Sequence, residues 1–309
     1  MKKLILILTT VILIIMSACI ADPTPSQTVE GSPTASSPTA SLPTASLPTA
    51  GPSPTPTQPT YDPNQTSPSV DKNSFDWNKA FLKREIVGEN ALVYRIYIPQ
   101  SYTGEDSLPI VFCLGSNNYG TDGNSHMEQT RVLFCDENSP FFDSIVVVPQ
   151  APATWNNMEG SLKNLIDTVT SMYNADDERI YLVSSGMGCF AGWKLLVKYP
   201  TLISSALFVH GPGVPVGSDG KNIVGVLDEV QDELIDIPLY FVHDTDDTSM
   251  DASYSKYSQS IVKALAVEGF SNVTMKETSG YGKDIINHFA SKGNIEVLNW
   301  LFAQRRTTK

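Results

Sequence analysis

The stretch from Ile180 to Phe190, IYLVSSGMGCF, has the pattern of a strand that runs into a glycine-rich bend and then a helix. At such a bend, the pattern Gly-x-Ser-x-Gly forces a serine into a strained turn, so that its hydroxyl projects as a nucleophile. Here the five positions fall on Ser184, Ser185, Gly186, Met187 and Gly188. Glycine adopts positive φ without penalty, so we expect the turn to form, but Gly186 offers no hydroxyl for acyl transfer.

Other hydroxyl groups lie close to this bend. Ser184 and Ser185 precede Gly186, and moving one or two residues along a strand reverses or displaces a side chain's direction. We therefore interpret them as strand-end serines that make local hydrogen bonds. The alternative is a rebuilt site that uses Ser184, Ser185 or Ser116 with His288 or His210 as its base, for which the spacing gives no support.

A cluster of acidic residues follows another apolar run in the stretch FVHDTDD, which holds His243, Asp244, Asp246 and Asp247. An aspartate here can orient a base, and a cluster of carboxylates can also bind a metal. Beyond His243, no histidine or cysteine joins the aspartates at ligand spacing. The pattern favours a solvated turn over a metal site, and we expect neither a metal nor a cofactor.

The elements that position these residues follow from apolar runs of strand length. These runs are Leu92–Ile98, Ile110–Leu114, Ile145–Val148, Ile180–Val183, Ala206–Val209, Leu239–Val242 and Val273–Met275. Helical apolar periodicity lies between several of them, at residues 162–172, 190–197 and 261–267. The alternation predicts an α/β fold with a mostly parallel sheet between helices. The first two runs are joined too closely for a crossover helix, so we expect them to pair antiparallel.

Several segments resemble extracellular α/β-hydrolase esterases of the feruloyl-esterase, polyhydroxyalkanoate-depolymerase and predicted-peptidase type. The similar segments are YRIYIPQSY with LPIVFCLG, VVVPQAP, DDERIYLVSSGMGCFAGWKLLVKYP, IPLYFVHDTDD and EVLNWLFAQRR. The third is the most specific, because such esterases have an Asp-x-x-Arg-Ile-Tyr-Leu strand start, a Ser-Met-Gly-Gly elbow and a tryptophan on the next helix. The resemblance covers nearly the whole domain and implies an α/β-hydrolase fold.

The resemblance also implies positions for a catalytic triad, and two of the three depart from the family pattern. The nucleophile position holds Gly186 and the base position holds Lys283. Only the acid matches, at Asp247, with Asp246 and Asp244 as near alternatives if the loop is displaced. A lysine that is charged at neutral pH cannot relay a proton as imidazole does. We expect Lys283 and Asp247 to form an ion pair instead.

The positions that would stabilise an oxyanion are partly altered as well. Gly115 and Ser116 stand where the family has His-Gly, while the backbone N–H of Met187 persists. These departures together predict an esterase-like pseudoenzyme that keeps a cleft for binding a polysaccharide or an ester-bearing ligand. The alternative is an active carboxylic-ester hydrolase with a rearranged nucleophile and base. Candidate residues lining the cleft are Trp155, Tyr119, His210 and Tyr281.

The amino-terminal region predicts export and anchoring. Residues 1–18 combine two lysines with an apolar run and small residues, which is typical of a signal peptide. The stretch MSAC resembles a bacterial lipobox, in which Cys19 would carry the lipid; an uncleaved anchor or a cut elsewhere are the alternatives. Residues 19–71 are rich in Pro, Thr and Ser and predict an extended stalk. The folded domain is then expected at residues 72–309, on the outer side of the membrane.

The net charge argues against some classes of partner, and the number of cysteines limits the disulfides that can form. The formal net charge of −12 argues against nucleic acid as a partner and against electrostatic binding to anionic surfaces. If Cys19 is lipidated, Cys113, Cys135 and Cys189 remain, so at most one disulfide can form. We interpret Cys113 and Cys189 as small apolar core residues.

Overall fold

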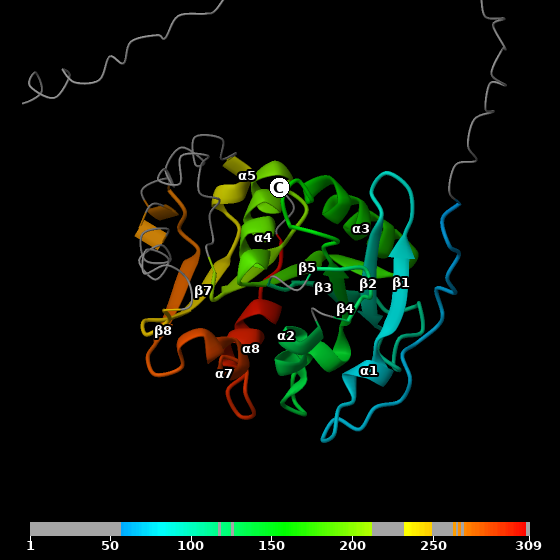
Figure 1. The fold of residues 1–309 in the computed structure, drawn as a ribbon, viewed down its shortest axis with the longest axis horizontal. Coiled ribbons are helices and arrows are strands. Elements are labelled where there is room, and N and C mark those ends of the chain that lie inside the picture. The colour runs from blue at the N-terminus through cyan, green and yellow to red at the C-terminus, as the bar shows by residue number, and fades with distance from the viewer. Residues whose placement is uncertain are drawn as a thin grey trace, which may run out of the picture. The chain divides into compact units, whose positions relative to one another are not determined.

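Among the described residues, eight strands form one sheet in the computed structural model (Figure 1). The structure describes residues 57–116, 119–124, 127–211, 232–248, 262–263, 265–266 and 269–306. The strands are β1 (Leu82–Ile86), β2 (Leu92–Tyr97), β3 (Leu108–Leu114), β4 (Ile145–Gln150), β5 (Ala175–Ser185), β6 (Ser205–Val209), β7 (Leu239–Asp244) and β8 (Val273–Thr278). Their order across the sheet is β1-β2-β4-β3-β5-β6-β7-β8, so β5 lies in the interior.

The sheet is parallel from β4 to β8 and antiparallel at its β1–β2 edge. The predicted mostly parallel sheet is therefore confirmed, but the predicted pairing of the first two runs is wrong. β2 runs antiparallel to β4, and β3 lies beyond β4 and pairs with β4 and β5. Neighbouring strands are only about 4.8 Å apart, so the short link from β2 to β3 easily passes over one strand.

Strand β1 has no counterpart among the predicted runs. Its sequence is LKREI, and only Ile86 is fully buried. As an edge strand it alternates buried and exposed positions, unlike the inner strands, whose runs are apolar on both faces. A search for continuous apolar runs therefore misses it.

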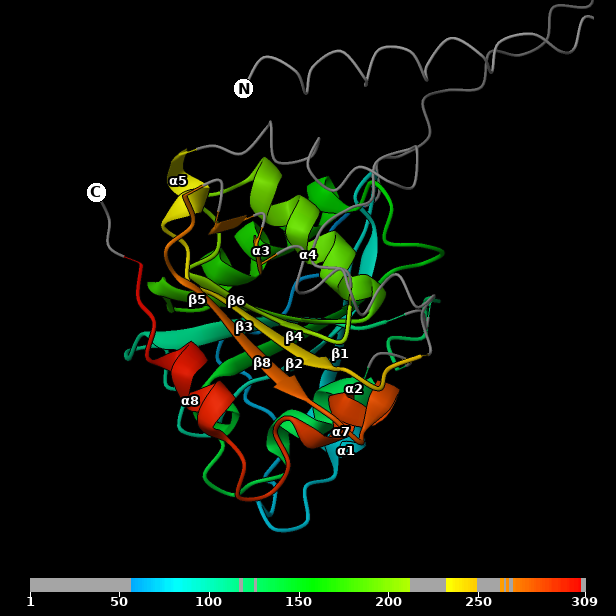
Figure 2. The same ribbon diagram turned by 90° about the vertical axis from the view of Figure 1, so that its left-hand side faces the viewer.

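Helices cover both faces of the sheet (Figures 1 and 2). One face carries α3 (Glu159–Met172), α4 (Met187–Lys198) and the short α5 (Asp232–Ile235). The other carries α1 (Trp77–Ala80), α2 (Met127–Arg131), α7 (Ile285–His288) and α8 (Glu296–Phe302), with 3-10 turns η1 (Val132–Phe134), η2 (Pro140–Asp143) and η4 (Gly282–Asp284). Each face has its own apolar cluster.

The predicted periodicity is borne out in α3 and α4. In α3, Leu162, Leu165, Ile166 and Val169 are buried, which is the spacing of one helix face. The third predicted helix, at residues 261–267, lies partly outside the described residues.

The segment before residue 72 contacts the sheet. The backbone N–H of Ser67 donates to the carbonyl of Ile98 at 2.9 Å, and the Ile98 N–H donates to the Ser67 hydroxyl at 2.8 Å. Farther back, the Gln58 amide exchanges hydrogen bonds with the backbone of Val87. Hydrogen bonding to the domain thus begins before the predicted boundary.

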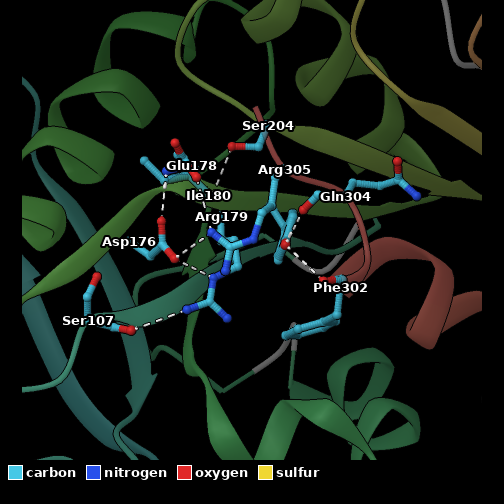
Figure 3. Close-up of polar contacts among 10 residues, drawn as sticks. Ser107, Asp176, Glu178, Arg179, Ile180, Ser204, Phe302, Gln304 and Arg305 are labelled. Carbon is cyan, nitrogen blue, oxygen red and sulfur yellow. Dashed lines mark hydrogen bonds and ion pairs between the residues drawn. The ribbon is translucent and has the colours of Figure 1, made fainter. Parts of the chain in front are cut away.

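Polar contacts hold the start of β5 in place (Figure 3). Asp176 accepts a hydrogen bond from the Glu178 N–H at 3.0 Å and pairs with Arg179 and Arg305. The Arg179 guanidinium also donates to the carbonyl of Ser107, just before β3, at 3.3 Å. The Asp-x-x-Arg segment thus joins β5, β3 and the carboxyl-terminal segment at the amino ends of the parallel strands. That edge is opposite the glycine-rich turn, so this cluster is structural.

The three cysteines in the described residues are free thiols. Cys113 and Cys189 are buried, as predicted for small core residues, whereas Cys135 is exposed. Burial raises the pKa of both buried thiols, so neither is a reactive thiolate at neutral pH.

Candidate functional site

The turn between β5 and α4 forms at Gly186 as the sequence predicts. Gly186 has φ +51° and ψ −125°, and its N–H donates to the carbonyl of His210 at 2.9 Å. Any residue with a side chain is strained at this φ, whereas glycine is not. A tight strand-to-helix turn of the kind that the Gly-x-Ser-x-Gly pattern forms is therefore present at the carboxyl end of β5, with glycine at its central position.

The space beside Gly186 is taken by Ser116, from the loop after β3. A Cβ built on Gly186 would lie 2.3 Å from the Ser116 Oγ and 2.8 Å from its Cβ. The two side chains therefore exclude one another. The Ser116 hydroxyl thus lies within the space that a side chain at position 186 would need.

Close packing against the backbone requires glycine at position 188. A Cβ on Gly188 would lie 2.2 Å from the carbonyl oxygen of Leu114 and 2.6 Å from that of Gly115. Helix α4 thus begins directly against the backbone at the end of β3. This contact brings Gly115, Ser116 and Met187, the predicted oxyanion positions, to one place.

The other two candidate serines point elsewhere. Ser184 is fully buried, and its Oγ lies 2.6 Å from where a Cβ on Gly192 of α4 would be. Ser185 donates from its hydroxyl to the Gln129 Oε1 at 2.7 Å. Ser184 therefore packs beneath α4, and Ser185 is committed to a side chain of α2.

A buried histidine–aspartate pair stands next to the elbow. His210 follows β6 with φ +49°, Asp247 follows β7, and the His210 Nδ1 contacts the Asp247 carboxylate. Their exposed fractions are only 7% and 6%. Burial lowers the pKa of His210, and the charge of Asp247 opposes that shift. The pKa of His210 therefore lies below its ordinary value, which favours the neutral imidazole, and Nδ1 is the ring nitrogen that faces the carboxylate.

This pair changes the expected role of Asp247. The sequence predicted an ion pair between Asp247 and Lys283, but the structure places the His210 imidazole against the Asp247 carboxylate. The signal available in the sequence was that His210 and Asp247 follow successive parallel strands, whose carboxyl ends meet at one sheet edge.

Lys283 lies on the turn η4, after β8, and is exposed. Its neighbour Gly282 packs near the acid loop, because a Cβ there would be 3.5 Å from the Asp246 carbonyl oxygen and 3.9 Å from the Asp247 Cα. The positions of nucleophile, acid and base inferred from the resemblance, including Gly186, thus share the carboxyl edge of the sheet.

Asp244, the first aspartate of the acidic cluster, has a structural role. Its fully buried carboxylate accepts hydrogen bonds from the Gly282 N–H at 2.9 Å, the Tyr281 N–H at 3.2 Å and the Thr278 hydroxyl at 2.8 Å. Burial raises its pKa, but these hydrogen bonds outweigh burial and leave the pKa below its ordinary value. The carboxylate therefore fastens the β8–η4 loop to β7.

Within the described residues, no group of three or more His, Cys, Asp or Glu side chains is arranged to hold a metal.

A cavity of about 320 Å³ opens at this edge. It is lined by Ser116, Gln129, Arg131, His210, Lys283, Asp284, Ile286 and Asn287. Most of these side chains are polar, and the lining contains two cations and one carboxylate besides the imidazole. The hydroxyl of Ser116 and the imidazole of His210 thus share one cavity.

Among the aromatic residues predicted for the cleft, Trp155 and Tyr281 have other contacts. Trp155 is buried, and its Nε1 donates to the carbonyl of Gly115 at 2.9 Å, which supports the loop from behind. Tyr281 is 45% exposed and stacks on His288 with ring centroids 4.5 Å apart. Tyr119 is half-buried against the α3–α4 core. Of the four predicted lining residues, His210 is the one that lines this cavity.

The fold is that of an α/β-hydrolase. Its features are a mostly parallel sheet with helices on both faces, a glycine turn after a central strand and an acid after β7. Solved structures with this fold include a thermostable esterase, at a TM-score of 0.61 and 21% sequence identity. The match covers 74% of this chain and 64% of that esterase, so the chain spans less than two thirds of its length.

Two further structures are similar over nearly their whole lengths. A feruloyl esterase module from Clostridium thermocellum, complexed with sinapinate, has a TM-score of 0.55 and 13% identity, covering 81% of this chain and 98% of the module. An S-formylglutathione hydrolase from Agrobacterium tumefaciens has a TM-score of 0.54 and 13% identity, covering 77% and 98%. No family model and no curated protein matches the sequence. These likenesses establish the fold, and the predicted α/β-hydrolase architecture is confirmed.

Proposed function

We propose that this protein is a surface-tethered binding protein with an esterase-like domain, in which the hydrolytic mechanism implied by its elbow is lost. The observation that carries the proposal is the pair of residues at the nucleophile and base positions. Gly186 has no hydroxyl, and Lys283 has no imidazole, yet a polar cavity remains open beside them. The cleft is kept while the family's reaction groups are replaced.

The ligand class follows from the cavity and the structural relatives. A polar lining with exposed cations suits a hydroxyl-rich ligand that carries ester or carboxylate groups. The Clostridium thermocellum relative is a feruloyl esterase module complexed with sinapinate, an aromatic carboxylate. We therefore propose a polysaccharide that bears aromatic ester groups as the ligand.

The location proposed for the protein is the outer face of a bacterial membrane. The support is the lipobox-like stretch that ends at Cys19, followed by the Pro/Thr/Ser-rich stalk to residue 71. Among the residues that the structure describes, no helix has the length and apolarity needed to cross a membrane. A lipid on Cys19 would supply the attachment, and the stalk would hold the cleft away from the bilayer.

The experiment is affinity electrophoresis of the full chain in native gels that contain soluble xylan with or without feruloyl esters. We expect retardation by the esterified polymer and weaker retardation by the stripped one. Lys283→Trp should reduce the retardation by filling the mouth of the cavity. Lys292→Trp is the matched control, because Lys292 is exposed and outside the lining. Equal mobility with and without polymer would contradict the proposed ligand class.

A further inference from the structure

We infer that the cleft contains a second Ser-His-Asp set, made of Ser116, His210 and Asp247, which hydrolyses esters without the elbow residue. The inference rests on the proposed binding of an ester-bearing ligand in this cleft. It assigns chemistry to three residues from the loops after β3, β6 and β7, none of which occupies the elbow.

The acid and base of this set are already paired. The contact between the His210 Nδ1 and the Asp247 carboxylate fixes the tautomer and the orientation of the ring. The backbone holds the pair as well, because the His210 N–H donates to the carbonyl of Val242 at 3.0 Å. With Nδ1 against the carboxylate, Nε2 is the ring nitrogen left to accept a proton from a hydroxyl in the cavity that His210 lines.

The hydroxyl available in the same cavity is that of Ser116. Its Oγ lies 2.3 Å from the place of a Cβ on Gly186, so it stands beside the point from which a side chain on the turn would project, and Ser116 lines the cavity. Glycine at position 186 is what makes room for it. The Ser116 side chain thus fits in the β3 loop because residue 186 has no side chain.

The Ser116 loop is held from two sides. The N–H of Ser116 donates to the Gln129 Oε1 at 2.7 Å, and the Trp155 indole donates to the carbonyls of Gly115 at 2.9 Å and Ser116 at 3.4 Å. Such support reduces the freedom of a nucleophile before the substrate arrives. The N-terminus of α4, at Met187, lies beside it and provides the positive end of a helix dipole for a developing oxyanion.

The reaction follows from these positions. The Ser116 Oγ attacks the ester carbonyl while the His210 Nε2 takes its proton, and the tetrahedral intermediate collapses as His210 returns that proton to the leaving alcohol. Water then attacks the acyl-serine and gives a proton to His210. Collapse releases the carboxylic acid, and the proton goes back to the Ser116 oxygen. One ester and one water yield one acid and one alcohol.

The first test is covalent labelling of the unmodified full chain with an alkyl fluorophosphonate. A serine activated by a base displaces fluoride from the phosphorus and keeps the phosphonyl group on its oxygen. We expect one added phosphonyl group, mapped to Ser116 by peptide mass spectrometry. Labelling of another serine, or no labelling at all, would overturn the inference, and neither result depends on a variant's folding.

The second test is the kcat/KM of the full chain for p-nitrophenyl acetate. We expect at least a 100-fold loss in Ser116→Ala, and similar losses in His210→Gln and Asp247→Asn. Ser184→Ala and His288→Ala are the controls, expected within about twofold of the parent, since Ser184 packs beneath α4 and His288 stacks on Tyr281.

The failures of the two proposals are distinguishable. A parent rate no higher than that of buffer, with xylan binding intact, would overturn the inference about Ser116 and leave the binding function standing. Turnover and labelling at Ser116 without xylan binding would contradict only the proposed ligand.

Discussion

At the scale of single residues, positions 186 and 116 act as a pair. Gly186 holds a positive φ of 51°, and its missing Cβ leaves the space that the Ser116 hydroxyl fills. A simple restoration of the elbow serine therefore places two side chains in one volume.

We predict that Gly186→Ser lowers the free energy of unfolding by about 3 kcal/mol, through overpacking and a strained φ. Adding Ser116→Gly removes the clash and should restore about half of that loss, the φ strain remaining. Urea unfolding of the parent, both single variants and the double variant gives the coupling energy. Additive effects of the two substitutions would show that the side chains do not compete for the same space.

The buried histidines predict a pH dependence of stability. Burial lowers the pKa of His243, with Asp247 the largest opposing influence and His210 reinforcing the shift, and burial lowers that of His210 too. Below the ordinary pKa of 6.5, the unfolded chain binds protons that the folded chain does not, so stability falls as pH decreases. Each histidine contributes a slope of at most about 1.4 kcal/mol per pH unit.

Urea unfolding at pH 7.5, 6.5 and 5.5 measures this slope. We expect His243→Leu to reduce it, because the His243 ring nitrogens have no hydrogen-bond partner within the described part of the chain and an apolar side chain fits there. His288→Leu, at an exposed position, is the matched control for the substitution itself. Stability that stays level or rises toward pH 5.5 would contradict this account.

At the scale of elements, the carboxyl end of β7 organises the site. Asp244 fastens the β8–η4 loop, while Asp247 holds the histidine from β6. Removing the Asp244 carboxylate leaves the N–H groups of Tyr281 and Gly282 without their acceptor. The loop that carries Lys283 then loses its attachment.

We predict that Asp244→Ala lowers the free energy of unfolding by about 3 kcal/mol, since several hydrogen bonds to a charged group are lost. Hydrogen exchange should also speed up at residues 279–284. Asp246→Ala is the control: among the described residues, its carboxylate accepts one bond, from the Gly280 N–H, so its effect should be smaller. Similar losses in both variants would argue against a special role for Asp244.

The strands and the main helices were predictable from sequence because their burial is periodic and local. Runs apolar on both faces located the inner strands, whereas β1 was missed because its outward side chains are charged. The elbow at Gly186 was also predictable, since a strand, glycines and a helix follow one another directly. The order of β2, β4 and β3 was not, because a short link does not determine which neighbour a strand pairs with.

The contacts of the site depend on how distant loops converge. The resemblance placed Lys283 beside Asp247, and the structure brings their loops together, but the imidazole that reaches the carboxylate comes from β6. Gly186 and Ser116 are 70 positions apart in the chain, yet they lie in contact. Spacing along the chain carries no information on such a contact.

At the scale of the whole molecule, the proposed lipid anchor and stalk determine where the cleft meets its ligand. We predict that Cys19→Ser moves the protein from the membrane fraction to the medium or stalls its processing, because the lipid is attached through the cysteine sulfur. Fractionation and immunoblotting measure this. Unchanged membrane retention with residues 1–18 still attached would favour an uncleaved anchor instead.

The stalk also predicts a cleavage pattern. Brief proteolysis of the membrane-bound protein should release the folded domain by cutting before residue 57, since within the described residues hydrogen bonds to the domain begin at Gln58. Mass spectrometry of the released fragment locates the cut. A first cut within residues 82–114, which contain β1, β2 and β3, would contradict the proposed arrangement.

The most direct measurement of the central claim is a crystal structure of the protein after reaction with an alkyl fluorophosphonate. The account predicts phosphonate density continuous with the Ser116 Oγ, next to Gly186, with the His210–Asp247 pair intact and the His210 Nε2 facing the adduct. Density on Ser184, Ser185 or a serine away from this cavity would contradict it, as would an unmodified Ser116 in a fully reacted crystal.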